Sequence, residues 1–216
     1  MPRSAVLAGA TGLVGSHVLN YLLKEPAYSR ITVLVRRALN VTHPALHVRE
    51  IEFDQIHLQQ FDPGADVYCA LGTTIRKAGS QQAFRKIDLE YPLALAKQAL
   101  ACGARSFLAV SSVGVNPATS NFYLKTKAEM EQAIGALPFE AVHIFRPSIL
   151  VGERQESRPA EKLGIVVAKA ISFSLIGSLR KYRPIEAETV ASAMVRTATH
   201  DARRGVHIHH YDEMAK

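Results

Sequence analysis

The sequence contains no tryptophan and only two cysteines, Cys69 and Cys102, which do not form a CxxC pair. So few cysteines exclude a disulfide framework and are typical of a reducing compartment. No segment offers the roughly 20 apolar residues that a membrane-spanning helix needs. The nearest approach, residues 163–179, is interrupted by Lys169, and the opening MPRSAVLAGA turns glycine-rich too early for a signal peptide. We therefore expect a soluble, cytoplasmic protein without membrane insertion.

A concentrated basic segment is also missing, although the net charge is +7. Lysine and arginine are spread along the chain, and neither zinc-finger spacing nor an aromatic–basic RNA-binding signature occurs, so we expect no nucleic-acid partner. The HIHH stretch at 207–210 has no third ligand at a suitable spacing. A terminal strand explains these histidines as well, and we expect no metal.

The pattern of hydrophobic residues predicts one α/β domain over residues 1–216. Hydrophobic residues make up 48% and charged residues 21% of the chain, which is typical of globular proteins. Apolar runs alternate with helical patterns, which indicates parallel strands joined through helices. Strands are expected at 2–8, 31–37, 46–54, 65–74, 106–112, 139–147 and 205–210, and helices at 13–25, 81–103 with Pro92 as a possible kink, 121–137, 161–176 and 189–199, the last capped by Thr189. This order predicts a Rossmann-like, doubly wound parallel sheet in three α/β/α layers.

The segment GATGLVGS, residues 9–16, stands between the first strand and the first helix. In the dinucleotide-binding fingerprint, one glycine permits a sharp turn, a second lets backbone N–H groups approach the pyrophosphate, and a third lets helix and strand pack closely. Gly9, Gly12 and Gly15 suit these roles, and the helix N-terminus adds unpaired donors. This context favours a cofactor site over an incidental turn. The residues expected to contact the cofactor here are Gly9, Thr11, Gly12, Leu13, Val14 and Gly15.

The second strand ends in LVRR, without the acidic residue that binds the ribose 2′-hydroxyl in NAD-specific folds. Arg36 and Arg37 instead offer two guanidinium groups, whose geometry suits a 2′-phosphate. The alternative is a pair of solvated surface arginines. Together with the glycine loop, the pair favours NADP(H) over NAD(H), with Arg36 the better placed of the two.

Tyr123 and Lys127 are four residues apart on an expected helix, so their side chains leave the same face. Ser111 and Ser112 end the fifth strand, at the edge where parallel sheets bind ligands. A phenol is a weak acid, and a neighbouring ammonium stabilises the phenolate. We predict a catalytic set of Ser112, Tyr123 and Lys127, with Lys127 also reaching the nicotinamide ribose; a tyrosine packed beneath a surface lysine is the alternative.

The sequence resembles the short-chain dehydrogenase/reductase superfamily in its atypical, NmrA-like branch, and within it the Tat-interacting oxidoreductase-like proteins. The resemblance rests on GATGLVGS, VRR, CALGTT, FRKIDLEY, SNFYLKTKAE and FRPSILVGERQESRPAE, which together cover nearly the whole chain. RQESRP is the most family-specific of these stretches. The resemblance implies an NADPH-binding Rossmann fold in which residues about 150–185 contribute a small substrate lobe.

The resemblance also assigns roles to single positions. Asp54, closing the third strand, is expected to accept a hydrogen bond from the adenine amine. Ser112 matches the catalytic serine, with Ser111 as the alternative, and Asp88 stands where extended relatives often carry an asparagine that supports the proton relay. The remaining positions implied to line the cofactor are Leu71, Gly72 and Thr73 at the adenine and ribose, and Arg146, Pro147 and Ser148 at the nicotinamide.

These observations lead to an NADPH-dependent oxidoreductase that transfers hydride to or from a small carbonyl or alcohol substrate. An NADPH-binding regulatory protein that acts through protein partners is the alternative, although NmrA-like proteins of that kind usually lack the Tyr–Lys pair. An epimerase or dehydratase is a third, weaker hypothesis. Arg154 or Arg158 are candidates to bind an acidic substrate or a partner, unless they pair with Glu153, Glu156 and Glu161. The resemblance to the superfamily is the sole ground for expecting a homodimer.

Overall fold

The computed structural model describes residues 3–56, 62–152 and 175–216. Its strands are β1 (Arg3–Ala8), β2 (Tyr28–Val35), β3 (Leu46–Glu50), β4 (Asp66–Cys69), β5 (Ser106–Val110), β6 (Ala141–Phe145), β7 (Leu150–Val151), β8 (Ile185–Glu186) and β9 (Gly205–His209). Its α-helices are α1 (Leu13–Leu22), α2 (Ile75–Ala78), α3 (Gln81–Arg85), α4 (Tyr91–Ala101), α5 (Phe122–Gly135), α7 (Ala187–His200) and α8 (Tyr211–Met214). Short 3-10 turns, η1 (Phe53–Gln55) and η3 (Gly177–Tyr182), and a π-helical turn, η2 (Lys86–Glu90), complete the set.

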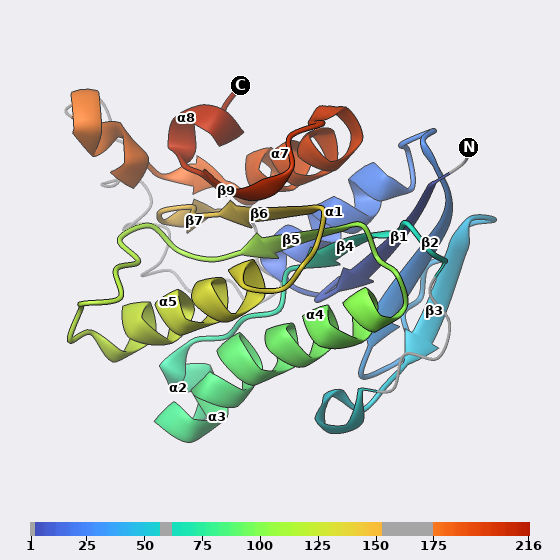
Figure 1. The fold of residues 1–216 in the computed structure, drawn as a ribbon, viewed down its shortest axis with the longest axis horizontal. Coiled ribbons are helices and arrows are strands. Elements are labelled where there is room, and N and C mark those ends of the chain that lie inside the picture. The colour runs from blue at the N-terminus through green and yellow to red at the C-terminus, as the bar shows by residue number, and fades with distance from the viewer. Residues whose placement is uncertain (1–2, 57–61, 153–174) are drawn as a thin grey trace.

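Seven strands form one parallel sheet in the order β3-β2-β1-β4-β5-β6-β9, which confirms the doubly wound Rossmann-like fold. Helices α1 and α7 cover one face and α4 and α5 cover the other, giving three layers (Figure 1). Because both faces are covered, the central strands carry runs of apolar residues that point to both faces, as in the buried VLV of β2. None of the helices in the described ranges has the length and apolar character needed to span a bilayer.

The register of the sheet brings the loops that follow four strands to one edge. Ala8 pairs with Cys69, and Cys69 with Ala109, so β1, β4 and β5 end nearly level. The ladder continues beyond the strands, because Ala70 N–H donates to the Ala8 carbonyl at 2.9 Å and Ser111 N–H donates to the Phe145 carbonyl at 2.7 Å. This carboxyl-terminal edge is where open α/β sheets bind their ligands.

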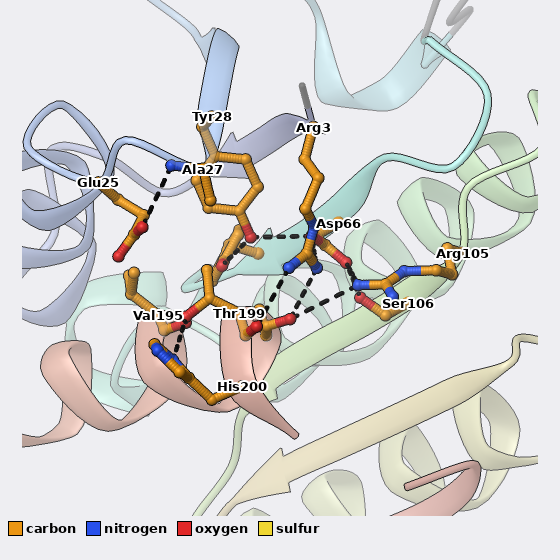
Figure 2. A network of polar contacts seen from close by, with 12 residues as sticks. Arg3, Glu25, Ala27, Tyr28, Asp66, Arg105, Ser106, Val195, Thr199 and His200 are labelled. Carbon is orange, nitrogen blue, oxygen red and sulfur yellow. Dashed lines mark hydrogen bonds and ion pairs between the residues drawn. The ribbon is translucent and has the colours of Figure 1, made fainter. Parts of the chain in front are cut away.

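The opposite edge is fixed by Asp66, a fully buried carboxylate at the start of β4 (Figure 2). Arg105 donates to its Oδ1 at 2.9 Å, the Tyr28 hydroxyl donates to its Oδ2 at 2.8 Å, and Arg3 forms an ion pair with Oδ2. Ser106 Oγ also donates to Oδ1, at 2.6 Å. A buried charge needs such partners, and here they join the four neighbouring strands β2, β1, β4 and β5 away from the ligand edge.

Three elements differ from the sequence prediction. The expected helix 81–103 is divided by the π-helical turn, in which Tyr91 N–H bonds the Lys86 carbonyl five residues back. Pro92 causes this widening, because it has no N–H for the Asp88 carbonyl and its ring crowds that oxygen. The third strand ends at Glu50 rather than residue 54. Helix α7 begins at Ala187 and not at a Thr189 cap.

Within the region expected as a substrate lobe, β7 and β8 form a separate two-stranded parallel sheet, and η3 precedes β8. The expected helix over residues 161–176 falls mainly in 153–174, outside the described residues. The candidate charges in and beside the RQESRP segment lie there too: Arg154, Arg158, Glu153, Glu156 and Glu161.

Candidate active site

The glycine loop joins β1 to α1 at the ligand edge and is built from backbone alone. Gly9 has φ 91°, and a Cβ there would lie 2.6 Å from the Ala70 carbonyl carbon in the next loop. A Cβ on Gly15 would lie 2.0 Å from the Gly9 oxygen. Only glycine therefore fits at either position, which matches the turn and close-packing roles predicted from the sequence.

The N-terminus of α1 is open. Its N-cap is Gly12, no side chain caps it, and its first turn carries no acid. Thr11 and Gly12 are both exposed, while Val14 and Gly15 are buried. The first backbone N–H groups of the helix and its positive dipole end therefore face the loop without a competing side chain. The described residues fit a dinucleotide pyrophosphate at this cradle.

Arg36 and Arg37 follow β2 immediately and are both exposed. Elsewhere along the described chain, arginines such as Arg3 and Arg146 are ion-paired, but neither of these two forms an ion pair or side-chain hydrogen bond with a described residue. Their guanidinium groups are thus available beside the loop after β2. Contact of these two arginines with a 2′-phosphate stays a prediction.

Asp54 does not close a strand as expected, but lies in η1 after β3 has ended. Its Oδ1 accepts hydrogen bonds from Lys86 Nζ at 2.7 Å and from the Tyr91 hydroxyl at 2.8 Å. The bond from Lys86, followed by that from Tyr91, holds the pKa of the Asp54 carboxyl below its usual range. Asp54 therefore remains an ionised, exposed acceptor.

Helix α5 packs against the continuous segment formed by α3 and η2. Tyr123 lies in the first turn of α5, and its ring packs on Phe84 of α3 with the ring centres 5.5 Å apart. One turn further along α5, Lys127 Nζ lies 2.7 Å from Oδ1 of Asp88 in η2. The predicted Tyr–Lys face therefore exists, and it meets a phenylalanine–aspartate face of the neighbouring helix.

The loop after β4 covers this ion pair. Thr73 N–H donates to Asp88 Oδ2 at 2.9 Å. A Cβ on Gly72 would lie 3.4 Å from Asp88 Oδ1 and 3.8 Å from Lys127 Nζ. Leu71, Gly72 and Thr73, which the family resemblance assigns to the cofactor, thus follow β4 directly over the buried charges. Burial also raises the pKa of Cys69, at the end of β4, to about 11, so this thiol stays neutral.

The two serines after β5 differ in their surroundings. Ser111 is buried and donates its hydroxyl to Glu131 Oε1. Glu131 in turn accepts from Arg146 Nε at 3.0 Å and forms an ion pair with the same guanidinium. Ser112 is half-buried, and its hydroxyl donates only to the neighbouring Val113 carbonyl at 3.3 Å. Among the described residues, the Ser112 hydroxyl is therefore less engaged than that of Ser111.

The Glu131 cluster also positions the loop after β6. Arg146 N–H donates to the His209 carbonyl at 2.9 Å, and the Pro147 carbonyl accepts from Val113 N–H at 2.8 Å. The Arg146 side chain is therefore engaged with Glu131, while Pro147 lies beside the strand-five loop that carries Ser112. Contact of either residue with a nicotinamide stays a prediction.

Sequence reasoning missed two members of the site. Glu131 was overlooked, although it continues the face of Tyr123 and Lys127 by one more helical turn. Asp88 was noted only as a departure from an asparagine, whereas the structure makes it the direct partner of Lys127. The four-residue spacing from Lys127 was the available signal for Glu131, whereas the burial of both carboxylates appears only in the structure.

Histidines gather on β6 and β9 without forming a metal centre. His143 Nδ1 lies 3.0 Å from His209 Nε2, and the His143 ring stacks on His207 with centres 5.3 Å apart. Within residues 3–56, 62–152 and 175–216, no group of three or more histidine, cysteine, aspartate or glutamate side chains is arranged to hold a metal ion.

Comparison with known sequences finds one matching family and several relatives of similar sequence. Residues 5–211 match the NAD dependent epimerase/dehydratase family. Protein HTATIP2 of Rattus norvegicus is 35% identical over 198 residues, which cover 89% of this chain and 80% of the relative. The mitochondrial protein FMP52 of Candida albicans is 35% identical over 201 residues, covering 89% of this chain and 86% of the relative. These relatives confirm the resemblance inferred from the sequence motifs.

Solved structures share the fold at low sequence identity. MoeE5 in complex with UDP-glucuronic acid and NAD aligns with a TM-score of 0.71 and 17% identity, covering 95% of this chain and 75% of that chain. A putative NAD-dependent epimerase/dehydratase from Bacillus halodurans aligns with a TM-score of 0.67 and 17% identity, covering 95% and 92%.

The expected cytoplasmic location is wrong. The FMP52 proteins of Candida albicans, Aspergillus fumigatus and Emericella nidulans, which are 31–35% identical to this chain, are all named mitochondrial, and this finding overturns the expectation. The scarcity of cysteine on which the expectation rested indicates a reducing compartment but does not distinguish the cytosol from a mitochondrial one.

Proposed function

The chain belongs to the NAD dependent epimerase/dehydratase family, and on that premise we propose that it is an NADPH-dependent oxidoreductase acting on a small carbonyl or alcohol. One observation carries the proposal. The glycine loop with the open N-terminus of α1 and the Tyr123–Lys127 face of α5 both lie at the carboxyl-terminal edge of the sheet. Binding of a dinucleotide requires only the backbone of the glycine loop. A buried lysine one turn from a tyrosine supports proton transfer as well.

The preference for NADPH rests on Arg36 and Arg37. Both are exposed directly after β2 and have no ion-pair partner among the described residues, so they can bind a 2′-phosphate without breaking an existing contact. Asp54 supports the other end of the adenosine. It is held ionised by Lys86 and Tyr91, and its carboxylate can accept the adenine amine.

A nicotinamide dinucleotide supplies or takes up hydride when it is bound. The chain's own residues handle the proton. In reduction the Tyr123 phenol donates its proton to the carbonyl oxygen, and in oxidation it takes the proton from the alcohol. Ser112 donates a hydrogen bond to the same oxygen and orients it, while Lys127 stabilises the phenolate and reaches toward the ribose.

The substrate is proposed to enter from the side of β7, β8 and η3. This small sheet follows the nicotinamide-side residues Arg146, Pro147 and Ser148 in the chain, and residues about 150–185 are proposed to form the substrate part of a single domain. MoeE5, solved in complex with UDP-glucuronic acid and NAD, is longer, since this chain covers 75% of it. The short lobe supports a smaller substrate.

The test is loss of NADPH absorbance with a panel of small aldehydes, ketones and quinones. We expect turnover with at least one compound, and a loss of about a hundredfold or more in kcat for Tyr123→Phe, because the proton donor is removed. Tyr21→Phe, on α1 where its hydroxyl bonds Glu188, is the matched control and keeps the wild-type rate. NADPH binding without any turnover supports the regulatory alternative, and turnover that survives Tyr123→Phe removes this residue from the reaction.

A further inference from the structure

We propose that β9, the last strand of the sheet, is the surface through which two copies of this chain pair to form a homodimer. The two β9 strands run antiparallel about a two-fold axis, so that the sheets of both copies join into one. The inference goes beyond the proposed function, because it assigns a partner surface that the reaction itself does not use.

The strand β9 has a partner on one side only. Among the described strands it pairs with β6 alone, and it borders the sheet on the side opposite β3 (Figure 1). Gly205 N–H donates to the Glu140 carbonyl, which directly precedes β6, at 2.8 Å. Because the backbone groups of alternate residues in a strand point to opposite sides, those of Val206 and Ile208 point away from β6. They are therefore placed to pair with a further strand.

The side chains on one face of β9 are large, apolar and exposed. Val206 is 51% exposed and Ile208 is 43% exposed, and the spacing of two residues puts them on the same face. The strand at the other border, β3, includes Arg49 and Glu50, whereas β9 reads GVHIH and contains no lysine, arginine, aspartate or glutamate. Charged side chains commonly protect an edge strand from association, and β9 lacks them.

A two-fold axis at His207 makes β9 complementary to itself. In an antiparallel pair centred on this residue, Val206 of one copy stands opposite Ile208 of the partner subunit. Both residues have their backbone groups on the outer side, so they exchange N–H···O=C bonds, and their side chains form apolar pairs across the two strands. Such an interface uses the same surface of both copies and closes at a dimer.

The charges at the two ends of β9 favour the antiparallel direction. Arg204 precedes the strand, its side chain is 81% exposed, and its guanidinium lies 3.6 Å from the Glu140 carboxylate. Beyond the other end, Glu213 Oε2 accepts from His210 N–H at 3.0 Å, which holds this carboxylate beside the residue that follows the strand. In the antiparallel register Arg204 stands opposite His210 of the partner subunit, next to that carboxylate. A parallel pair instead brings the two copies of Arg204 together, which is unfavourable.

The first test is the molar mass of the full chain, measured by light scattering over a concentration series up to about 100 µM. We expect a mass twice the 23.6 kDa of one chain. Ile208→Lys puts a charge against the apolar pair and is expected to raise the dissociation constant about tenfold or more. Val48→Lys is the matched control on β3, where Val48 is 37% exposed, and leaves the dimer intact. A wild-type chain that stays monomeric throughout the series overturns the proposal, even if the edge of β9 binds another protein.

The second test is a cross-link through His207→Cys, which reports the register. The axis places this position opposite its own copy in a pair without mutual hydrogen bonds, with Cα atoms about 4.5 Å apart, which suits a disulfide. With oxidised glutathione as the oxidant, we expect a covalent dimer on a non-reducing gel. Arg204→Cys, whose two copies lie about 20 Å apart, is expected to form none, and the wild type controls for Cys69 and Cys102.

These measurements also separate this interface from other ways of dimerising. A dimer that survives Ile208→Lys unchanged and is not cross-linked through His207→Cys is formed by another face, and the proposal is then wrong. Neither measurement uses NADPH or a substrate, so the result is independent of whether the proposed reaction takes place.

Discussion

Mild acid is expected to destabilise the fold through His143 and His209. The two rings lie on neighbouring strands, are 1% and 5% exposed, and share a hydrogen bond of 3.0 Å that requires an unprotonated acceptor. Burial lowers the pKa of each imidazole from its ordinary 6.5 to about 4. Between these values the unfolded chain binds more protons than the folded one, so the free energy of unfolding falls as the pH decreases.

The size of this effect follows from the shift. A folded-state pKa about 2.5 units below the ordinary value limits the loss to roughly 3 kcal/mol per imidazole, reached below about pH 4. From about pH 7 to about pH 5, one imidazole accounts for about 2 kcal/mol. Because protonation of one ring affects the other, protonation of both is expected to lower the free energy of unfolding by about 2 to 4 kcal/mol over that range.

Urea unfolding at these two pH values measures the effect. The double variant His143→Gln/His209→Gln keeps a neutral, hydrogen-bonding pair and has no imidazole to protonate at these positions. Between the two pH values its free energy of unfolding is therefore expected to fall by about 2 to 4 kcal/mol less than that of the wild type. His47→Gln, on the exposed face of β3, serves as the control and follows the wild type. Equal losses in the wild type and the double variant refute the reasoning.

Three further predictions concern the cofactor site and the sheet. Arg36→Ala is expected to reduce the preference for NADPH over NADH about tenfold in fluorescence titrations, because a guanidinium partner of the 2′-phosphate is lost; an unchanged preference assigns that role elsewhere. Asp66→Ala is expected to lower the free energy of unfolding by about 3 kcal/mol, since two guanidinium groups lose a buried partner, while the exposed Asp62→Ala changes it by less than about 0.5 kcal/mol. Gly15→Ala is expected to yield little folded protein on expression, because its Cβ would collide with the Gly9 carbonyl; a folded variant with normal stability contradicts the close packing.

The sequence was sufficient for the doubly wound parallel fold and for the glycine turn between β1 and α1, because both depend on local signals. Alternation of apolar strands with helices permits few topologies, and glycines at a strand–helix junction have a direct steric meaning. The same local signals also placed Tyr123 and Lys127 on one helix face.

What the sequence did not show depends on contacts between distant segments. Glu131 resembles an ordinary exposed helix residue until Arg146 and Ser111 are brought against it by the ends of two strands. His143 sits in an apolar strand, and only its pairing with His209 across the sheet explains its burial. Pro92 suggested a kink, but the π-turn and the ion pair of Asp88 with Lys127 appear only in the structure.

The central claim, that the backbone of the glycine loop binds the dinucleotide, is tested most directly by NADPH fluorescence titration of Gly12→Val. Gly12 is exposed and has φ −81°, which any residue can adopt, and a Cβ there lies 3.2 Å from the Gly9 oxygen, a contact that a shift of a few tenths of an ångström relieves, so the variant is expected to fold. Its side chain occupies the pyrophosphate space and weakens binding by about a hundredfold or more, whereas Gly135→Ala in α5, where a Cβ meets only Val206 at 3.6 Å, binds as the wild type does. A folded Gly12→Val protein with wild-type affinity for NADPH contradicts the account.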